Sequence, residues 1–229
     1  MKSFLKDNYL YLLLFACWMA VGGVLLASYD KADLHLLLNT RHSSVADFIF
    51  SHYTLLAEFG PYIVAAGLLF YKASTACYVL LAELLAGGVT QIVKNIVCAP
   101  RPKVFFDIAN NPDILPLVDG VRLHSSFSFP SGHTTTFFAL ATTLVVIVGQ
   151  TQWGKENWKR MLFQLCIFFF ALLGGYSRIY LSQHFMADVY VGSIIGLVVA
   201  FLLMPLLTFI QQRFPRFSNW HLPVHKRSK

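Results

Sequence analysis

Charged residues are scarce in this sequence. Asp, Glu, Lys and Arg make up 13% of its 229 residues, about half of the ~25% that an ordinary soluble domain carries. Hydrophobic residues make up 56%, and the mean hydropathy is +0.59. Too few charges remain to cover the surface of a water-soluble globule, and the many aromatic and branched residues exclude a disordered chain. The composition predicts one integral membrane domain over residues 1–229.

Cysteines are few, and the positive charges are not clustered. The four cysteines are widely spaced, with no CxxC or Cys/His pattern, so they predict neither a disulfide framework nor a zinc site. The net charge of +7 and the pI near 9.3 are those of many nucleic-acid-binding proteins. However, the basic residues form no long run and no stripe interleaved with aromatics, so we expect no nucleic-acid partner.

Long apolar runs are abundant, and each is long enough to cross a ~30 Å hydrocarbon layer as a helix, the second only just. The first run exceeds a typical signal-peptide core and no clear cleavage site follows, so we expect a retained helix. The fold class predicted is an all-α integral membrane protein with six transmembrane helices and a helical-bundle core. The runs cover residues 9–28, 55–71, 74–97, 133–150, 161–181 and 189–211.

Lys and Arg fall unevenly on the two sides of this arrangement. With six spans, the N-terminus, the loop near residue 72, the segment 151–160 and the C-terminal tail share one side, and they hold most of the 18 basic residues. Cytoplasmic segments carry such an excess, so both termini are predicted in the cytoplasm. The compact size and short tails are typical of a bacterial protein, which predicts the inner membrane and a periplasmic opposite face.

Two longer segments connect spans on that opposite face. Segment 29–53 mixes charged and apolar residues, which suits short helices in the interface plane, although a plain loop explains it nearly as well. Segment 98–131 holds many turn formers between Asn110 and Gly120, and predicts an irregular loop. Gly192 and Gly196 form a GxxxG pair that predicts close helix packing within the bundle, with a homodimer as the alternative.

Ionisable residues recur at four successive helix ends on the outer face. Singly, each has a structural explanation: a lysine that reaches the interface, a serine N-cap, or an i,i+4 pair. Their repetition at one face favours a common site. The four groups are Lys94 with Arg101, then His133 with its neighbours Ser131 and Gly132, then Arg178, and finally His184 with Asp188.

The chemistry of these groups suits a phosphate dianion. Lys94, Arg101 and Arg178 supply positive charge, and arginine binds phosphate oxygens through two donors at once. The helix that begins near Gly132 adds free backbone N–H groups, and glycine permits a close approach. A phosphate-binding pocket is therefore predicted where these elements meet.

Two histidines add reactivity to that pocket. On a continuous helix His184 and Asp188 would share one face, so the carboxylate could hold the imidazole while its other nitrogen attacks phosphorus. His133 could protonate the departing oxygen and then activate water. This double displacement needs no metal. Zinc held by the same three residues is the alternative, which the nearby cations oppose.

The segments Lys94-x6-Arg101-Pro102, Pro130-Ser131-Gly132-His133 and Ser177-Arg178-x5-His184-x3-Asp188 together resemble the three-part signature of the type 2 phosphatidic acid phosphatases. That superfamily also includes glucose-6-phosphatase and the vanadium haloperoxidases, and the motif region spans residues 94–188. The resemblance implies a membrane lipid phosphatase without metal or cofactor, acting at the external face. His184 would form a phosphohistidine, Asp188 would orient it and His133 would be the acid and base. The phosphoryl group would be bound by Lys94, Arg101, Ser131, Gly132 and Arg178.

The resemblance leaves the substrate open among phosphatidate, phosphatidylglycerophosphate, undecaprenyl diphosphate, sphingoid phosphates and lipid A phosphates. We expect the loop 103–129 to select the headgroup. A lipid-to-lipid phosphotransferase and a non-enzymatic anion or lipid transporter are the alternative functions. Two carboxylates inside the spans, Glu58 and Glu83, are expected to serve structural pairing more than catalysis.

Overall fold

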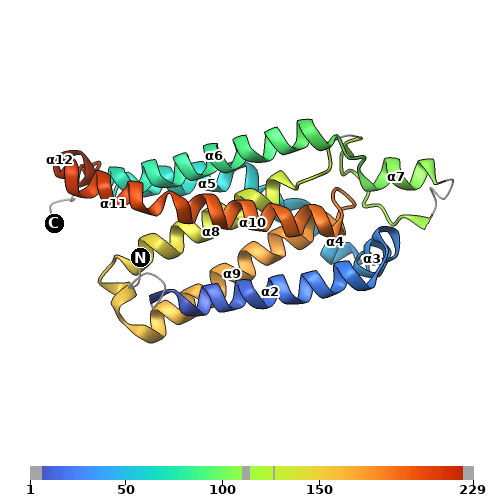
Figure 1. Ribbon diagram of the computed structural model, residues 1–229, viewed down its shortest axis with the longest axis horizontal. Coiled ribbons are helices and arrows are strands. Elements are labelled where there is room, and N and C mark those ends of the chain that lie inside the picture. Colours follow the sequence, from blue (N-terminus) through green and yellow to red (C-terminus); the bar gives the residue numbers. More distant parts are fainter. Residues whose placement is uncertain (1–6, 110–113, 126, 224–229) are drawn as a thin grey trace.

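The computed structural model describes residues 7–109, 114–125 and 127–223, and within these ranges it contains helices and no strand. It therefore confirms the all-α prediction. Figure 1 shows the long helices running side by side. They are α2 (Tyr9–Ser28), α6 (Ala73–Val97), α8 (Gly132–Gly149), α9 (Asn157–Tyr180) and α10 (Met186–Leu202). The shorter ones are α3 (Lys31–Leu38), α4 (Ser44–Tyr53), α5 (Leu56–Leu68), α7 (Pro102–Ile108), the 3-10 turn η2 (Trp153–Lys155), α11 (Met204–Arg213) and α12 (Pro215–Ser218).

Five helical segments are long and apolar enough to cross a membrane, whereas α5 has 13 residues. At 1.5 Å per residue α5 is ~20 Å long, which is less than the ~30 Å hydrocarbon layer. The count of six spans thus stays a prediction. In Figure 1, α5 still runs from the α4 end of the bundle towards the other end, where α11 and α12 lie.

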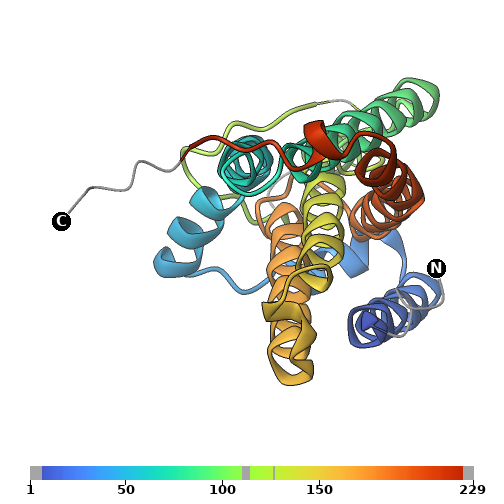
Figure 2. The ribbon, with the colours of Figure 1, turned by 90° about the vertical axis from the view of Figure 1, so that its left-hand side faces the viewer.

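Helix α8 lies in the middle of the bundle, with α6, α9 and α10 packed against it (Figure 2). Phe137 and Phe138 of α8 are fully buried and join a core with Phe168 of α9. Gly192 and Gly196 face the α8 backbone: an added Cβ would lie 2.7 Å from the Ser131 oxygen and 2.4 Å from the Thr135 oxygen, respectively. The GxxxG pair therefore packs inside the chain, as predicted, and the homodimer stays a prediction.

The two outer segments contain more helix than a plain loop would have. Helices α3 and α4 form within 29–53, as one of the two interpretations predicted. In 98–131 the prediction of an irregular loop is wrong for α7, which begins with Pro102 at its first position and buries Phe106 against Leu115 and Phe185. The turn formers at 110–113 lie outside the described residues.

Helix α3 buries a histidine beside the outer end of the bundle. His35 is 0% exposed, and its ring packs 5.1 Å from the ring of Phe185. Neither ring nitrogen has a hydrogen-bonding partner in the described part of the chain. Burial lowers the pKa of His35 to about 4, with Asp188 opposing and Lys31 adding to the shift. The ring is thus held neutral in the folded protein.

Acidification is expected to destabilise the fold through His35. Its pKa is below the ordinary histidine value of 6.5, so the unfolded chain binds the proton more readily, and the free energy of unfolding falls as the pH drops below 6.5. Between pH 7.5 and 5 this amounts to about 2 kcal/mol. In His35→Leu we therefore expect the free energy of unfolding to fall by about 2 kcal/mol less than in the wild type over this pH range. Denaturant titration in detergent measures it. The exposed His52 provides a control, because in His52→Leu the free energy of unfolding should fall between pH 7.5 and 5 by as much as in the wild type. If it also fell by the wild-type amount in His35→Leu, the prediction would be contradicted.

Candidate active site

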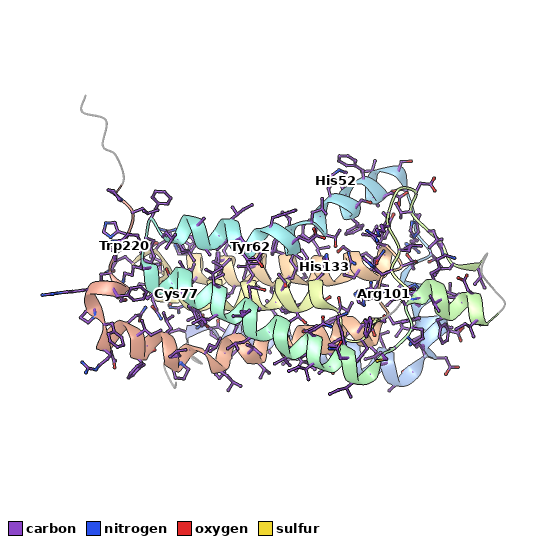
Figure 3. The ribbon with its side chains drawn as sticks, turned by 90° about the horizontal axis from the view of Figure 1, so that it is seen from above. His52, Tyr62, Cys77, Arg101, His133 and Trp220 are labelled. Atoms are coloured by element: carbon purple, nitrogen blue, oxygen red, sulfur yellow. The ribbon has the colours of Figure 1, made fainter. Side chains whose placement is uncertain are left out.

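A cavity of about 410 Å³ opens at the end of the bundle where α3, α4 and α7 lie. It takes side chains from the ends of α6, α8 and α9 and from the loops before α7 and α10, and Figure 3 shows Arg101 and His133 at this end. Ser131 and Asp188 are buried and do not line it. The predicted site residues that line it are Lys94, Arg101, Gly132, His133, Arg178 and His184, joined by Gln91, His124, Ser125 and Phe127.

The three cations are fixed mainly by neutral oxygen atoms. Lys94 Nζ donates to the Phe127 carbonyl at 2.5 Å, and Arg178 donates to Thr54 Oγ1 at 2.5 Å. One nitrogen of Arg101 donates to both the carbonyl and the side-chain oxygen of Gln183, at 3.2 and 3.0 Å. In the described ranges neither Lys94 nor Arg178 forms an ion pair, and Arg178 Nε has no partner. An anion in the cavity would balance this charge.

The start of α8 forms one wall of the cavity. The Ser131 side chain caps the helix by accepting from the Thr134 N–H, and its own N–H donates to the Asp188 carbonyl at 2.9 Å. Ser131 thus connects α8 to α10 behind the cavity. At Gly132 an added Cβ would meet only a Thr90 methyl group, 4.0 Å away. The space beside Gly132 is therefore open to a ligand, next to the unpaired N–H groups of a helix start.

His184 and Asp188 meet without sharing a helix. His184 precedes α10, whose N-cap is Phe185, and Asp188 is in its first turn. The Asp188 Oδ2 atom lies 3.2 Å from His184 Nδ1 and also accepts from the Phe185 N–H at 3.0 Å and from Ser128 Oγ at 2.5 Å. The predicted contact is present, but helix capping produces it, where we had expected one face of a continuous helix.

The environment of His184 favours the neutral imidazole. Burial lowers its pKa, Asp188 partly opposes this, and the charges of Arg101 and Arg178 lower it further. A carboxylate can only accept, so the Nδ1 atom facing Asp188 carries the proton. The Nε2 lone pair is then left available for nucleophilic attack.

His133 has a carboxylate beside it. Its Nε2 atom lies 3.4 Å from Oε1 of Glu58, which comes from α5. The pairing expected for Glu58 is therefore present, and its partner is a predicted catalytic residue.

A second cavity continues from the first along α5, α6 and α8. It encloses about 720 Å³ and shares Gln91, Gly132 and His133 with the site cavity. Tyr62, which lines it, is on the same flank of the bundle as His133 in Figure 3. We call it the lateral groove. Most of its lining residues are apolar or glycine, and the polar ones are Glu58, Glu83, Gln91, His133 and Thr136, with Tyr62 adding a hydroxyl.

Three polar residues that hold the site were missed by the sequence analysis. Ser128 binds Asp188, Gln183 holds Arg101, and Thr54 holds Arg178. Neutral side chains like these carry no charge signal. Only the position of Gln183 directly before His184 could have suggested a role.

Some residues of the loop 103–129 line the cavity, and others pack in a hydrophobic cluster. His124, Ser125 and Phe127 line the cavity, whereas Phe105 and Phe106 pack with Phe185. Headgroup selection by this loop stays a prediction. Zinc was the alternative use of His133, His184 and Asp188, and the described residues contain no group of three His, Cys, Asp or Glu side chains placed to hold a metal.

A family model and several characterised relatives match the sequence of this chain. The family model described as the PAP2 superfamily matches residues 75–212. Phosphatidylglycerophosphatase B of Bacillus subtilis is 30% identical over 61% of this chain and 62% of its own length. Lipid A 4'-phosphatase of Bacteroides thetaiotaomicron is 28% identical over 72% of this chain and 71% of its own. The match thus spans less than two thirds of the Bacillus relative.

Solved structures share the fold. The crystal structure of Aquifex aeolicus LpxE has a TM-score of 0.61 at 24% identity and covers 77% of this chain and 96% of that one. A PAP2-type phosphatidylglycerolphosphate phosphatase from Bacillus subtilis has a TM-score of 0.58 at 23% identity, covering 95% and 100%. At these identities the likeness concerns the fold.

Proposed function

The chain belongs to the PAP2 superfamily, and from this premise we propose that it is an integral-membrane lipid phosphatase that hydrolyses a lipid phosphomonoester or diphosphate through a phosphohistidine. The observation that carries the proposal is the neutral, Asp188-bound His184 beside Lys94, Arg101 and Arg178. A pocket for anion binding alone has no need of such a nucleophile.

In the first step, His184 Nε2 attacks phosphorus and a P–N bond forms as the bond to the lipid oxygen breaks. His133 donates its proton to that oxygen, so a phosphomonoester releases the neutral lipid alcohol and a diphosphate releases the protonated lipid monophosphate. The cations and the α8 N-terminus stabilise the charge on the phosphoryl oxygens. Asp188 stabilises the positive charge that develops on the His184 ring.

In the second step, His133 accepts a proton from water as the water oxygen attacks phosphorus. The P–N bond breaks, its electrons return to His184, and inorganic phosphate leaves. His133 is again protonated, so both histidines regain their starting state. A lipid hydroxyl in place of water would make the protein a phosphotransferase.

The proposed location is a bacterial inner membrane with the site facing the periplasm. Six of the described basic residues lie in segments at the end of the bundle opposite the cavity, and cytoplasmic segments carry such an excess. They are Lys72, Lys155, Lys159, Arg160, Arg213 and Arg216. The substrate is proposed to be a lipid phosphate because the named relatives include phosphatases of phosphatidylglycerophosphate and lipid A.

The test is phosphate release by purified protein from phosphatidate, phosphatidylglycerophosphate, lipid A and undecaprenyl diphosphate, with and without EDTA. We expect release from at least one lipid and no loss of rate with EDTA, because side chains supply every charge in the proposed steps. No release from any of the lipids would contradict the phosphatase proposal. Release that EDTA abolishes would contradict metal independence alone.

Glu58 is expected to position His133 without touching the substrate. In Glu58→Gln we expect kcat to fall about 3- to 10-fold with KM nearly unchanged, because the protonated imidazole loses its counter-charge. This is smaller than the roughly 10²- to 10⁴-fold contribution of a general acid itself, which remains in place. Glu58→Asp should recover part of the rate. Steady-state kinetics in detergent micelles measures both values, and a rise in KM at constant kcat would show instead that Glu58 acts in binding.

A further inference from the structure

The lateral groove contains a carboxyl that the proposed reaction does not use. Glu83 of α6 lines the groove, and the hydroxyl of Thr136 from α8 lies beside it. Its Oε1 atom is buried and has no hydrogen-bonding partner within the described ranges. Nor does Glu83 form an ion pair there. A buried polar atom without a partner costs free energy, so its presence calls for an explanation such as a ligand that binds it.

Glu83 is on the path that leads away from the phosphate cavity. Glu83, Gly87 and Gln91 are spaced four residues apart, so they follow one face of α6, and Gln91 lines both cavities. On α8, Thr136 is three residues beyond His133, a rise of about 5 Å. The carboxyl is thus about one helical turn deeper along the groove than the catalytic histidine.

The groove is open and apolar at that depth. Added Cβ atoms at Gly87 and Gly88 would meet no atom within 4 Å, and Leu80, Leu84 and Pro61 line the walls. A charged carboxylate is costly in such surroundings, whereas a protonated carboxyl is tolerated and offers one O–H donor. A ligand chain that passes Gln91 and His133 would therefore meet the O–H of Glu83 between the apolar side chains of Leu80 and Leu84.

We propose that Glu83 is a polar subsite that donates a hydrogen bond to an ester carbonyl of a glycerophospholipid phosphate. In such a lipid the ester carbonyls follow the phosphate after a few bonds, a distance comparable to the helical turn between His133 and Thr136. Polyprenyl phosphates have only hydrocarbon there and cannot satisfy Glu83. This inference rests on the proposed lipid phosphatase function and narrows its substrate to ester-linked glycerolipids.

The experiment compares phosphatidate with its ether-linked analogue, which has the same chains and no carbonyls. For the wild type we expect kcat/KM to be about fivefold higher on the ester, or about 1 kcal/mol. Glu83→Leu should abolish this ratio, and Glu83→Gln, which keeps an N–H donor, should keep part of it. Leu80→Ala is the matched control, since it alters the same groove without a polar group and should leave the ratio unchanged.

Two results would overturn the proposal: equal rates of the wild type on both lipids, or an undiminished ester preference in Glu83→Leu. Should Glu83→Leu not fold, Glu83→Met takes its place, and the wild-type ratio alone remains decisive. Failure of the phosphatase proposal would look different, because no lipid would then release phosphate. Release without an ester preference contradicts only the role of Glu83.

Discussion

Replacing His184 with alanine is expected to lower phosphate release by at least about 10⁴-fold, the scale of loss when a catalytic nucleophile or its base is removed. Without the imidazole no P–N bond can form, and water would have to attack the lipid phosphate directly. The cations and the α8 N-terminus would remain, so lipid binding should persist. The measurements are the initial rate of phosphate release and lipid binding by the purified variant.

The matched control is His52→Ala, since His52 is an exposed histidine on α4 whose ring bonds the carbonyl of Phe48 and packs against the Phe48 ring, away from the cavity lining. It should keep wild-type activity and stability. A second readout is covalent: with labelled lipid phosphate and an alkaline quench, the wild type should carry label and His184→Ala should carry none. Activity of His184→Ala within tenfold of the wild type would contradict the phosphohistidine.

The second large effect concerns Gly196, where α10 crosses α8. Its Cβ in Gly196→Ala would lie 2.4 Å from the Thr135 oxygen and 2.7 Å from the Ala139 nitrogen. Both are backbone atoms of a helix, so the two helices must move apart. Overpacking of this kind typically costs 1–3 kcal/mol, and we expect a loss of about 3 kcal/mol here.

Activity should fall together with stability in Gly196→Ala. Helix α8 carries His133, α10 carries Asp188, and the bond from the Ser131 N–H to the Asp188 carbonyl joins them. Unfolding in detergent and phosphate release measure the two effects. Gly67→Ala is the control, because nothing lies within 4 Å of a Cβ there and alanine favours the helix. Equal stability of the two variants would show that α8 and α10 are not in rigid contact.

Much of the site could be predicted from charge in an apolar chain. In a membrane helix an ionisable residue is costly, so Lys94, Arg178 and His133 were noticeable before any contact was known, and their signature predicted the family that the comparisons confirm. The roles assigned to them stay predictions. Ser128, Gln183 and Thr54 could not be found in this way, because neutral polar side chains are common at helix ends and in loops.

The sequence by itself determined the membrane class, the long helices and most of the charged residues that meet at the cavity, because hydropathy and charge are local properties that the bilayer selects strongly. Only the tertiary structure decided that α5 is short, that Asp188 reaches His184 by capping α10, and that Glu58 faces His133. It also placed Glu83 in a groove continuous with the site. The contact of Glu58 and the groove around Glu83 join segments far apart in the chain, whereas the start of α10 and the length of α5 depend on local backbone geometry. The order of residues carries no periodic signal for any of them.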